Sequence, residues 1–448
     1  MIFLTTPIVV WLSTSAYIDL GMTFFTTGSL IAFLYWRDSD YRRIGWLLLS
    51  AVCMGLAVGS KYNALIAWLI LSILLVLVYV RDTKRQAAGV GFGLIFVLVA
   101  VAVASPWYLK NFMLTGNPFY PLFQRIFEVA QQQSLPAAVQ TKAAEESSKI
   151  GFFQMRKILY GESFIETLLI PLRMFFQGSD DGYQYFQGVL NPILILFVPF
   201  VFLRRGFRRD VLFLLGFCGL FMVLAYFLTE KQVRYILPVI PCLSIVAAVG
   251  IHHLVSWLEN FPRTSLRRPG VVAVSLSVVF LLCMNVTYLV RHVKKMDPIP
   301  VVSGKETRED YLKRKLRHYR AVDYANRHLP ADAVVFTMFL GRRGYYLDRP
   351  YRNERYFGAL TLHRLVHASE TPEAFSKVVS DLGVSHLLVR IDVFHRYLND
   401  NFTADQIRQF FERIQKYWVL VYNAKDYAIW QVGEVHLPKT THSSKRTA

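Results

Sequence analysis

Long uncharged stretches of apolar residues recur along the first two thirds of the chain, and they limit what it can fold into. Most are close to the ~20 residues that a helix needs to cross a ~30 Å hydrocarbon core. Hydrophobic residues make up 54% of the chain, above the ~45–50% of ordinary globular proteins. The sequence therefore predicts a polytopic α-helical membrane protein with eight full spans and a partial one at residues 1–13. The predicted full spans are 20–36, 44–60, 62–80, 87–107, 189–203, 211–229, 235–258 and 270–290.

The net charge of +19 is spread unevenly over the loops between these spans. By the positive-inside rule, loops rich in Lys and Arg lie in the cytoplasm and poor loops lie on the other side. The prediction is a multi-pass membrane protein whose long loop and C-terminal region lie on the outer face, with no nucleic-acid partner. Loops 37–43, 81–85, 204–210 and 259–269 carry three, three, four and three Lys or Arg, whereas loops 60–63 and 229–234 carry one and two.

The composition changes at residue 292 to that of a soluble protein. Before that, the aromatic-rich residues 107–123 open a long loop and predict an interfacial helix and turn. After 292, alternating helix and strand signals predict a small α/β domain. Its predicted elements are helices at 307–330, 371–383 and 403–417, strands at 332–340 and 384–392, and a hairpin at 418–432. The predicted organisation is a first transmembrane region (1–107), a long loop on the outer face (108–188), a second transmembrane region (189–291), an α/β domain on the outer face (292–434) and a disordered tail (435–448).

Charged residues at the predicted outer ends of the spans are candidates for a functional site. Asp19 is the only acidic residue before Asp38, and a carboxylate within a bilayer is a functional candidate. The alternative is that Asp19 caps the helix that begins there. For Lys61 the alternative is a lysine that snorkels to the interface, and for Arg234 with Tyr235 it is an interfacial anchor.

Two further carboxylates, Asp180 and Asp181, lie among aromatic residues at the end of the long loop. They are candidate catalytic groups beside Asp19, with a solvated turn as the alternative. A carboxylate and two or three cations around a single cavity would bind a phosphate and remove a proton from an attacking hydroxyl. That chemistry suits transfer of a group from a lipid phosphate. Cytoplasmic loops this short cannot hold a domain that binds a nucleotide donor.

Several motifs carry a resemblance over nearly the whole chain: "LTTPIVVWLSTSAYIDLGMTFF", "GLAVGSKY", "ASPWYLKNFMLTGNPFYPLF", "KQVRYILPVIP" and "LPADAVVFTMFLGRRGYYLDRPY". They resemble the polyprenyl-phosphate-sugar-dependent membrane glycosyltransferases of the GT-C superfamily, in the branch that is protein mannosyltransferase-like and aminoarabinose transferase-like. The stretches around Lys110, Asn117, Tyr120 and Tyr235 are the more specific ones, so these residues are candidates for binding substrate.

The resemblance implies transfer of a sugar from a polyprenyl-phosphate carrier to an acceptor hydroxyl on a lipid, a polysaccharide or a protein. It implies that the protein lies in the inner (plasma) membrane of a bacterium, with its active face, the long loop and the C-terminal α/β domain in the periplasm. It implies that Asp19 matches a second acidic position of the family, and that Lys61 and Arg234 lie near the donor phosphate. The family's principal catalytic aspartate is in its first outer loop, and we expect that loop and the first spans to be missing from this chain. Asp19, Asp180 or Asp181 would then have to act as the base.

Two alternatives stay open at this point. No cofactor is required by the resemblance, although a divalent metal is used by some relatives, and no ligand spacing here argues for one. The second alternative is a non-catalytic membrane protein: a transporter, a flippase, or a pseudoenzyme of the same fold. Transporters are expected to place charged or Gly/Pro-broken positions at mid-span, and the predicted spans here are nearly free of charge at their centres. The expected partners are the lipid-linked sugar donor, a glycolipid or protein acceptor, and membrane lipids.

Overall fold

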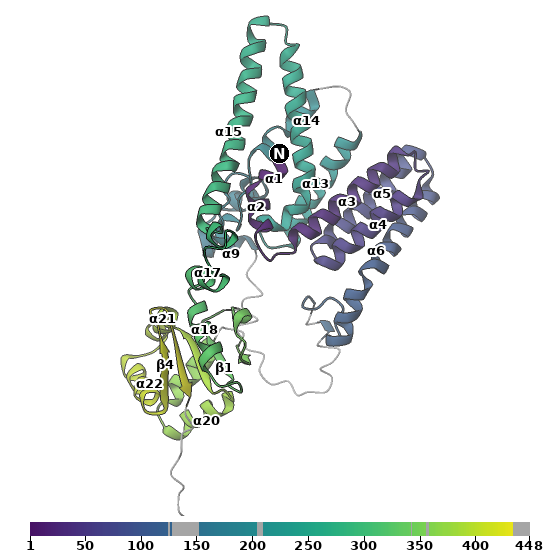
Figure 1. The fold of residues 1–448 in the computed structure, drawn as a ribbon. Helices are drawn as coiled ribbons and strands as arrows, with labels where there is room; N and C mark the ends of the chain where they lie inside the picture. The colour runs from purple at the N-terminus through teal and green to yellow at the C-terminus, as the bar shows by residue number, and fades with distance from the viewer. Residues whose placement is uncertain (124–125, 128–151, 204–208, 342, 355–357, 433–448) are drawn as a thin grey trace, which may run out of the picture. The chain divides into compact units, whose positions relative to one another are not determined.

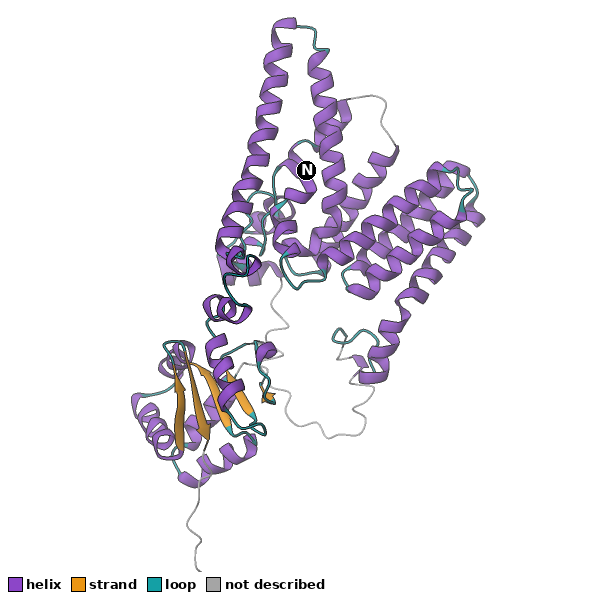
Figure 2. Ribbon diagram, in the orientation of Figure 1, coloured by secondary structure: helices purple, strands orange, loops and turns teal. Residues whose placement is uncertain are grey.

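The computed structural model describes residues 1–123, 126–127, 152–203, 209–341, 343–354 and 358–432. The chain divides into two compact units, Met1–Lys295 and Met296–Ala448, which are drawn in Figure 1. The predicted disordered tail, 435–448, lies outside the described residues. The first unit is helical, and the second contains the sheet (Figure 2).

The helices of the first unit begin with two short ones and continue with longer apolar ones. They are α1 (Ile2–Thr5), α2 (Pro7–Ser13), α3 (Asp19–Asp38), α4 (Ile44–Ser60), α5 (Ala64–Thr83), α6 (Gln86–Thr115), α9 (Phe152–Tyr160), α10 (Phe164–Leu168), α11 (Ile170–Arg173), η2 (Tyr183–Tyr185), α12 (Ile193–Leu196), η3 (Val198–Leu203), α13 (Arg209–Leu228), η4 (Val233–Val239), α14 (Ile240–Glu259) and α15 (Thr264–Met296).

Within the described residues, five helical segments are long and apolar enough to cross a membrane: Ala64–Thr83, Gln86–Thr115, Arg209–Leu228, Val233–Glu259 and Thr264–Met296. This finding supports a multi-pass helical membrane protein but not the count of eight spans. Within the predicted span at 189–203, Pro192 is the N-cap of α12, and the α-helix changes to the 3-10 helix η3 near Pro199, whose missing N–H removes one helical hydrogen bond.

The segment predicted as a separate interfacial helix, 107–123, instead begins as the last turns of α6. The helix continues through Pro106 and ends at Gly116, whose left-handed conformation (φ 70°) is the usual helix stop. A turn with Asn117 and Pro118 follows. The aromatic residues of this segment therefore extend a membrane-length helix rather than form a new one.

Close helix packing in the first unit depends on small residues. A Cβ placed on Gly55 of α4 would lie 2.6 Å from the carbonyl oxygen of Ala100 in α6. Glycine at this position lets the two backbones approach each other, as small residues do between membrane helices. α4 also packs along α3, so α3, α4 and α6 form adjacent layers.

The Arg37 end of α3 is held by ion pairs to two other helices. The Nε of Arg37 donates to Asp82 at the end of α5 (2.8 Å), and its Nη1 donates to Asp210 at the start of α13 (3.0 Å). Tyr41 also donates to Asp82. The side chains of Arg37 and Asp82 are 6% and 12% exposed, whereas that of Asp210 is 41% exposed. The pair of Arg37 with Asp82 is therefore the desolvated one, and removing Arg37 would leave a largely buried carboxylate without this partner.

A second buried ion network holds the segment between α9 and α11. Glu162 is buried and accepts hydrogen bonds from Arg156 Nη2 (2.9 Å) and Arg173 Nη2 (3.2 Å). Burial by itself raises the pKa of Glu162, but hydrogen bonds and charges from the two arginines lower it below its ordinary value. The carboxylate is therefore the form that this fold stabilises.

The second unit is a five-stranded sheet in the order β2-β1-β3-β5-β4. β1 is parallel to β2 and β3, and β5 is antiparallel to β3 and β4. Side chains alternate between faces: Phe336 and Leu387 belong to one buried cluster, and Val335 and Leu388 belong to the other. The elements are α16 (Ile299–Val302), α17 (Arg308–Lys315), α18 (Tyr319–His328), β1 (Val335–Met338), η5 (Gly344–Tyr346), β2 (Tyr351–Arg352), α19 (Ala359–Ala368), α20 (Pro372–Leu382), β3 (His386–Arg390), α21 (Ile391–Asn401), α22 (Ala404–Tyr417), β4 (Trp418–Asn423) and β5 (Tyr427–Val432).

The helix predicted over 307–330 is two helices, α17 and α18, separated by residues 316–318. No proline or glycine marks the break. α18 has buried residues at Ala321, Val322 and Ala325, whereas α17 buries only Leu312. The two helices therefore differ in how they contact the core, and a single straight helix does not form.

Candidate functional site

Asp19 is the first residue of α3 and is fully buried. Its Oδ1 accepts a hydrogen bond from Lys61 Nζ at 2.5 Å. Its Oδ2 is also buried, and among the described residues it has no hydrogen-bond partner. The N-cap position belongs to Ile18, and no side chain caps the helix. The alternative that Asp19 serves as a cap is therefore wrong, and one carboxylate oxygen is left to accept a proton or a hydrogen bond.

Lys61 lies in the short connection between α4 and α5. Its side chain is 18% exposed, and its Nζ lies 4.7 Å from the centre of the Tyr235 ring. Burial lowers the pKa of Lys61, as does the charge of Arg234, while the hydrogen bond and charge of Asp19 raise it. A lysine that only snorkelled would extend to water, so the structure contradicts that alternative.

Arg234 belongs to η4 and lies between two aromatic rings. Its guanidinium carbon is 5.0 Å from the ring centre of Tyr17 and 5.1 Å from that of Tyr235. Its Nε donates to the side-chain oxygen of the buried Gln232 (2.7 Å). In the part of the chain that the structure describes, no carboxylate forms an ion pair with Arg234. The orientation of this cation is thus fixed while its charge is left for a ligand.

These contacts bring Asp19, Lys61, Arg234 and Tyr235 together, and we call them the Asp19 cluster. They come from the start of α3, the α4–α5 connection and η4. The side chain of Asn63, at the end of the α4–α5 connection, donates to the backbone oxygen of Tyr235 in η4 (2.7 Å) and so links these two segments. Two cations and one carboxylate give the cluster an excess of one positive charge. A phosphate ester would neutralise that excess.

Three residues at this site were not predicted from the sequence: Tyr17, Asn63 and Gln232. Tyr17 and Gln232 each lie two residues before a predicted site residue, Asp19 and Arg234. That proximity was the available signal. Asn63 gave no such signal, because a polar residue just before a helix is usually explained by a capping role.

Asp180 and Asp181 make their contacts elsewhere, against α15. Asp180 Oδ2 accepts from the hydroxyl of Tyr288 (2.7 Å), and the exposed Asp181 pairs with Lys295 (3.2 Å). No hydrogen bond or ion pair between described residues joins either carboxylate to the Asp19 cluster. Of the three candidate bases, only Asp19 therefore has contacts among the described residues that connect it to Lys61.

The remaining predicted substrate-binding residues follow α6. Lys110 is exposed and lies 5.5 Å from the Trp107 ring. Asn117 holds its own turn, because its Nδ2 donates to the oxygen of Leu122 (2.7 Å) and its Oδ1 accepts from the amide of Phe119 (2.9 Å). The backbone oxygen of Tyr120 accepts from the hydroxyl of Tyr62 (2.7 Å), which connects this turn to the residue after Lys61.

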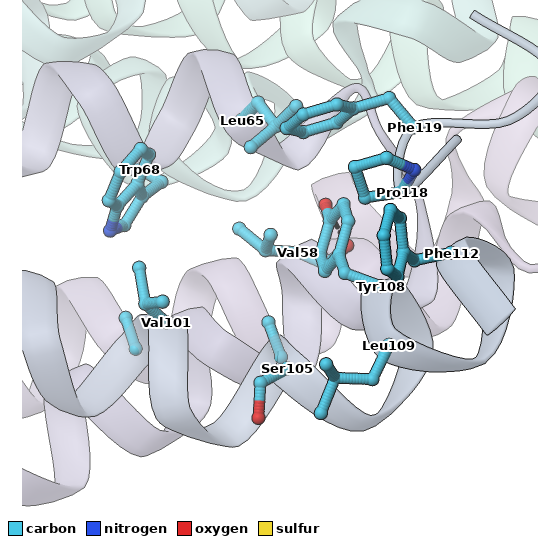
Figure 3. A pocket seen from close by; sticks show the side chains of 12 residues that line it. Val58, Leu65, Trp68, Val101, Ser105, Tyr108, Leu109, Phe112, Pro118 and Phe119 are labelled. Carbon is cyan, nitrogen blue, oxygen red and sulfur yellow. Dashed lines mark hydrogen bonds between the residues drawn. The ribbon is translucent and has the colours of Figure 1, made fainter. Parts of the chain in front are cut away.

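An apolar pocket of about 380 Å³ lies between α4, α5, α6 and this turn. Figure 3 shows the aromatic rings of Trp68, Tyr108, Phe112 and Phe119 around it. A cavity with this lining fits a hydrocarbon chain better than a polar ligand. The lining residues are Val58, Leu65, Trp68, Ala100, Val101, Ala104, Ser105, Tyr108, Leu109, Phe112, Pro118 and Phe119.

Residues 1–241 match the family described as "Domain of unknown function (DUF8201)". The chain belongs to that family. The matched residues include the whole Asp19 cluster and the apolar pocket, so both are features of a DUF8201 region.

This DUF8201 protein also has curated relatives over a shorter stretch. It is 36% identical over 97 residues to the undecaprenyl phosphate-alpha-4-amino-4-deoxy-L-arabinose arabinosyl transferase of Pseudomonas paraeruginosa, which is 21% of this chain and 17% of the relative. The protein of the same name from Pseudomonas aeruginosa is 35% identical over 97 residues, with the same coverage. The matched part thus spans about a sixth of these relatives. The match confirms the resemblance to the aminoarabinose transferase-like branch.

Two solved structures are similar in outline. The crystal structure of ArnT from Cupriavidus metallidurans bound to undecaprenyl phosphate aligns with a TM-score of 0.46 and 16% identity, covering 96% of this chain and 77% of that chain. Its apo state aligns with a TM-score of 0.46 and 15% identity, covering 95% and 76%.

Proposed function

We propose that this protein is an integral membrane glycosyltransferase that moves a sugar from a polyprenyl-phosphate carrier to an acceptor hydroxyl. The acceptor is a lipid, a polysaccharide or a protein, and the reaction takes place on the periplasmic face of the inner membrane. The named activity of the curated relatives, which is arabinosyl transfer from an undecaprenyl-phosphate carrier, supports this class of reaction.

The observation that carries the proposal is the arrangement of Asp19, Lys61 and Arg234. Asp19 has one oxygen paired with Lys61 and one buried oxygen that has no hydrogen-bond partner among the described residues. Arg234 is oriented by Gln232 and two tyrosine rings and has no counter-ion among the described residues. A buried acceptor of protons beside an uncompensated cation is what group transfer from a phosphate ester requires.

In the proposed reaction the acceptor oxygen attacks the anomeric carbon of the donor sugar. The bond from that carbon to the phosphate oxygen breaks through an oxocarbenium-like state with inversion. The acceptor proton passes to Asp19 Oδ2, and polyprenyl phosphate leaves with the bonding electron pair. Arg234 and Lys61 stabilise the charge that develops on the leaving phosphate, which lowers the barrier only if they are held in place beforehand. Asp180 and Asp181 have no part in this proton transfer.

The apolar pocket is where the prenyl chain of the carrier would lie. Val58 and Leu65, which line it, lie three residues before and four residues after Lys61. A prenyl chain in the pocket would therefore have its phosphate near the cations of the Asp19 cluster. Asn117 and Tyr120 shape the turn at one side of the pocket, and Lys110 remains a candidate for contact with a headgroup.

The proposal retains eight full spans, with α3, α4 and the segment 189–203 inside the bilayer beside the five long helical segments. It includes no metal step. Within the described residues, no group of three or more His, Cys, Asp or Glu side chains is arranged to hold a metal ion, so the residues present do not fit one.

Release of polyprenyl phosphate tests the proposal without knowledge of the acceptor. The full chain is reconstituted in nanodiscs with a panel of undecaprenyl-phosphate sugars and candidate glycolipid acceptors, and the released undecaprenyl phosphate is measured by mass spectrometry. With one active donor, Asp19→Asn is expected to slow release ~10²–10⁴-fold, the usual contribution of a general base.

The matched control is Asp38→Asn, which makes the same change at the exposed opposite end of α3 and should leave the rate unchanged. Full activity in Asp19→Asn would remove the catalytic assignment. Movement of intact lipid-linked sugar across the bilayer without release of the phosphate would instead identify a flippase.

A further inference from the structure

The second unit contains a polar cavity of about 420 Å³. This volume lies in the ~300–1,000 Å³ range of small-molecule sites. All of its lining residues belong to the second unit, so the cavity is separate from the Asp19 cluster and does not depend on the function proposed above.

The cavity lies at the position where open α/β sheets bind ligands. β1 and β3 are adjacent and parallel, so their carboxyl ends lie at the same edge of the sheet. Arg390 ends β3, and Arg343 lies in the loop that follows β1. Ligands of such sheets bind just beyond the carboxyl ends of the strands.

The charge around the cavity is predominantly positive. Asp392 is paired with Arg390 through two hydrogen bonds of 2.7 Å, so these two charges balance. Two further arginines, Arg317 and Arg343, line the cavity against one more carboxylate, that of Asp426. Lys315 lines it as well, and its charge also acts on Glu306. The excess of cations favours an anionic ligand.

The start of α18 adds a second feature that favours an anion. His318, which lines the cavity, is the N-cap residue of this ten-residue helix, and its side chain makes no capping hydrogen bond. The first turn contains no acidic residue. The partial positive charge of the helix terminus is therefore not neutralised by its own residues. Burial, together with the charge of Arg343, lowers the pKa of His318, which keeps the imidazole neutral at pH 7 and able to donate one hydrogen bond.

We propose that this cavity binds the phosphoryl group of a phosphorylated saccharide. Lys315, Arg317 and Arg343 contact the phosphate oxygens together with the start of α18. Asp426, which lines the same cavity, accepts hydrogen bonds from sugar hydroxyls. A phosphate alone would use the cations but not the carboxylate, so the site favours the sugar phosphate over inorganic phosphate.

Calorimetric titration of the full chain in phosphatidylcholine nanodiscs tests this site, with glucose 1-phosphate as the probe. We expect glucose 1-phosphate to bind more tightly than inorganic phosphate, and glucose not to bind. Arg317→Ala and Arg343→Ala change exposed side chains, so folding is not at risk, and each should weaken binding about 10-fold or more because a charge-assisted hydrogen bond is lost. Arg408→Ala, a change to an exposed arginine of α22, should have no effect.

Further variants separate this site from the Asp19 cluster and identify the kind of ligand. Binding should persist in Arg234→Ala, and Asp426→Asn should remove the preference for glucose 1-phosphate over phosphate. Competition by phosphatidic acid placed in the nanodisc would mean that a lipid headgroup can supply the phosphate, and absence of competition would mean a soluble sugar phosphate; both support the site. Failure of glucose 1-phosphate to bind, unchanged binding in both arginine variants, or loss of binding in Arg234→Ala would overturn it.

Discussion

Replacing Lys61 by methionine should destabilise the protein far more than the loss of an ordinary surface ion pair would. The side chain of Asp19 is 1% exposed and that of Lys61 is 18% exposed, and they are 2.5 Å apart. Exposed pairs contribute ~0–1 kcal/mol, whereas removing one partner of a buried pair costs ~3–5 kcal/mol because the other charge is left uncompensated. Lys61→Met keeps the length of the side chain but removes the charge, so we expect a loss of about 3–5 kcal/mol in the free energy of unfolding.

The double variant Asp19→Leu/Lys61→Met removes both charges and should be more stable than Lys61→Met alone, since apolar replacement of a buried pair is often neutral or stabilising. Reversible unfolding in mixed micelles is followed by circular dichroism at pH 7 for the unchanged protein, Asp19→Leu, Lys61→Met and the double variant. The four free energies give the coupling between the two positions. Arg408→Met, at the exposed Asp405–Arg408 pair, is the control and should cost under about 1 kcal/mol. A cost below about 1 kcal/mol for Lys61→Met, or simple additivity in the double variant, would refute a desolvated pair.

Three further predictions follow from other contacts. Arg234→Ala should raise the concentration of lipid-linked donor needed for half-maximal release about 10-fold or more. Arg234→Lys should restore the donor requirement only in part, because lysine lacks the planar guanidinium. An unchanged donor requirement in Arg234→Ala would mean that Arg234 is only an interfacial anchor. The lowered pKa of Glu162 means that its contribution to stability is present above its unfolded value of ~4.3 and is lost as the pH falls through its folded value. In Glu162→Gln the free energy of unfolding should therefore depend less on pH in that window than it does in the unchanged protein. The same dependence on pH in both would contradict a stabilising role for the Glu162 carboxylate. Gly55→Val should reduce the free energy of unfolding by ~1–3 kcal/mol, because a Cβ there would lie 2.6 Å from the oxygen of Ala100. Gly45→Ala should not reduce it, because a Cβ at Gly45 would have nothing within 4 Å. Thermal unfolding of the two variants measures the difference.

Local signals in the sequence predicted much of the second unit. The strands at 332–340 and 384–392 correspond to β1 and β3, and the hairpin at 418–432 corresponds to β4 and β5. The helix at 371–383 begins with a hydrogen bond to Thr371 and ends at Gly383 (φ 56°). In each case the deciding interactions are between near neighbours in the chain, such as caps and alternating side chains, so they can be recognised without a structure.

The features that were not predicted depend on residues far apart in the chain. Asp19 and Lys61 are separated by 42 positions, and Asp180 and Tyr288 by 108. The alternation of loops between the two sides of the membrane put Asp19, Lys61 and Arg234 at one face, but only the packing of α3 against α4 and η4 decides that these three meet. The same alternation put Asp180 and Asp181 at that face, yet their side chains contact α15 instead.

The ion pairs at the two ends of α3 constrain how the first unit can move. Lys61, just before α5, pairs with Asp19 at the start of α3, and Asp82 near the end of α5 pairs with Arg37 near the end of α3. The two helices are thus connected by an ion pair at each end. Sliding by one helical turn, ~5.4 Å, would break both pairs at once. It would leave the buried Asp19 without its counter-ion, whereas Arg37 would keep Asp210 and Asp82 would keep Arg81. The resistance to sliding therefore lies chiefly at the Asp19 end, and an opening that admits a bulky ligand is expected to move α3 and α5 together.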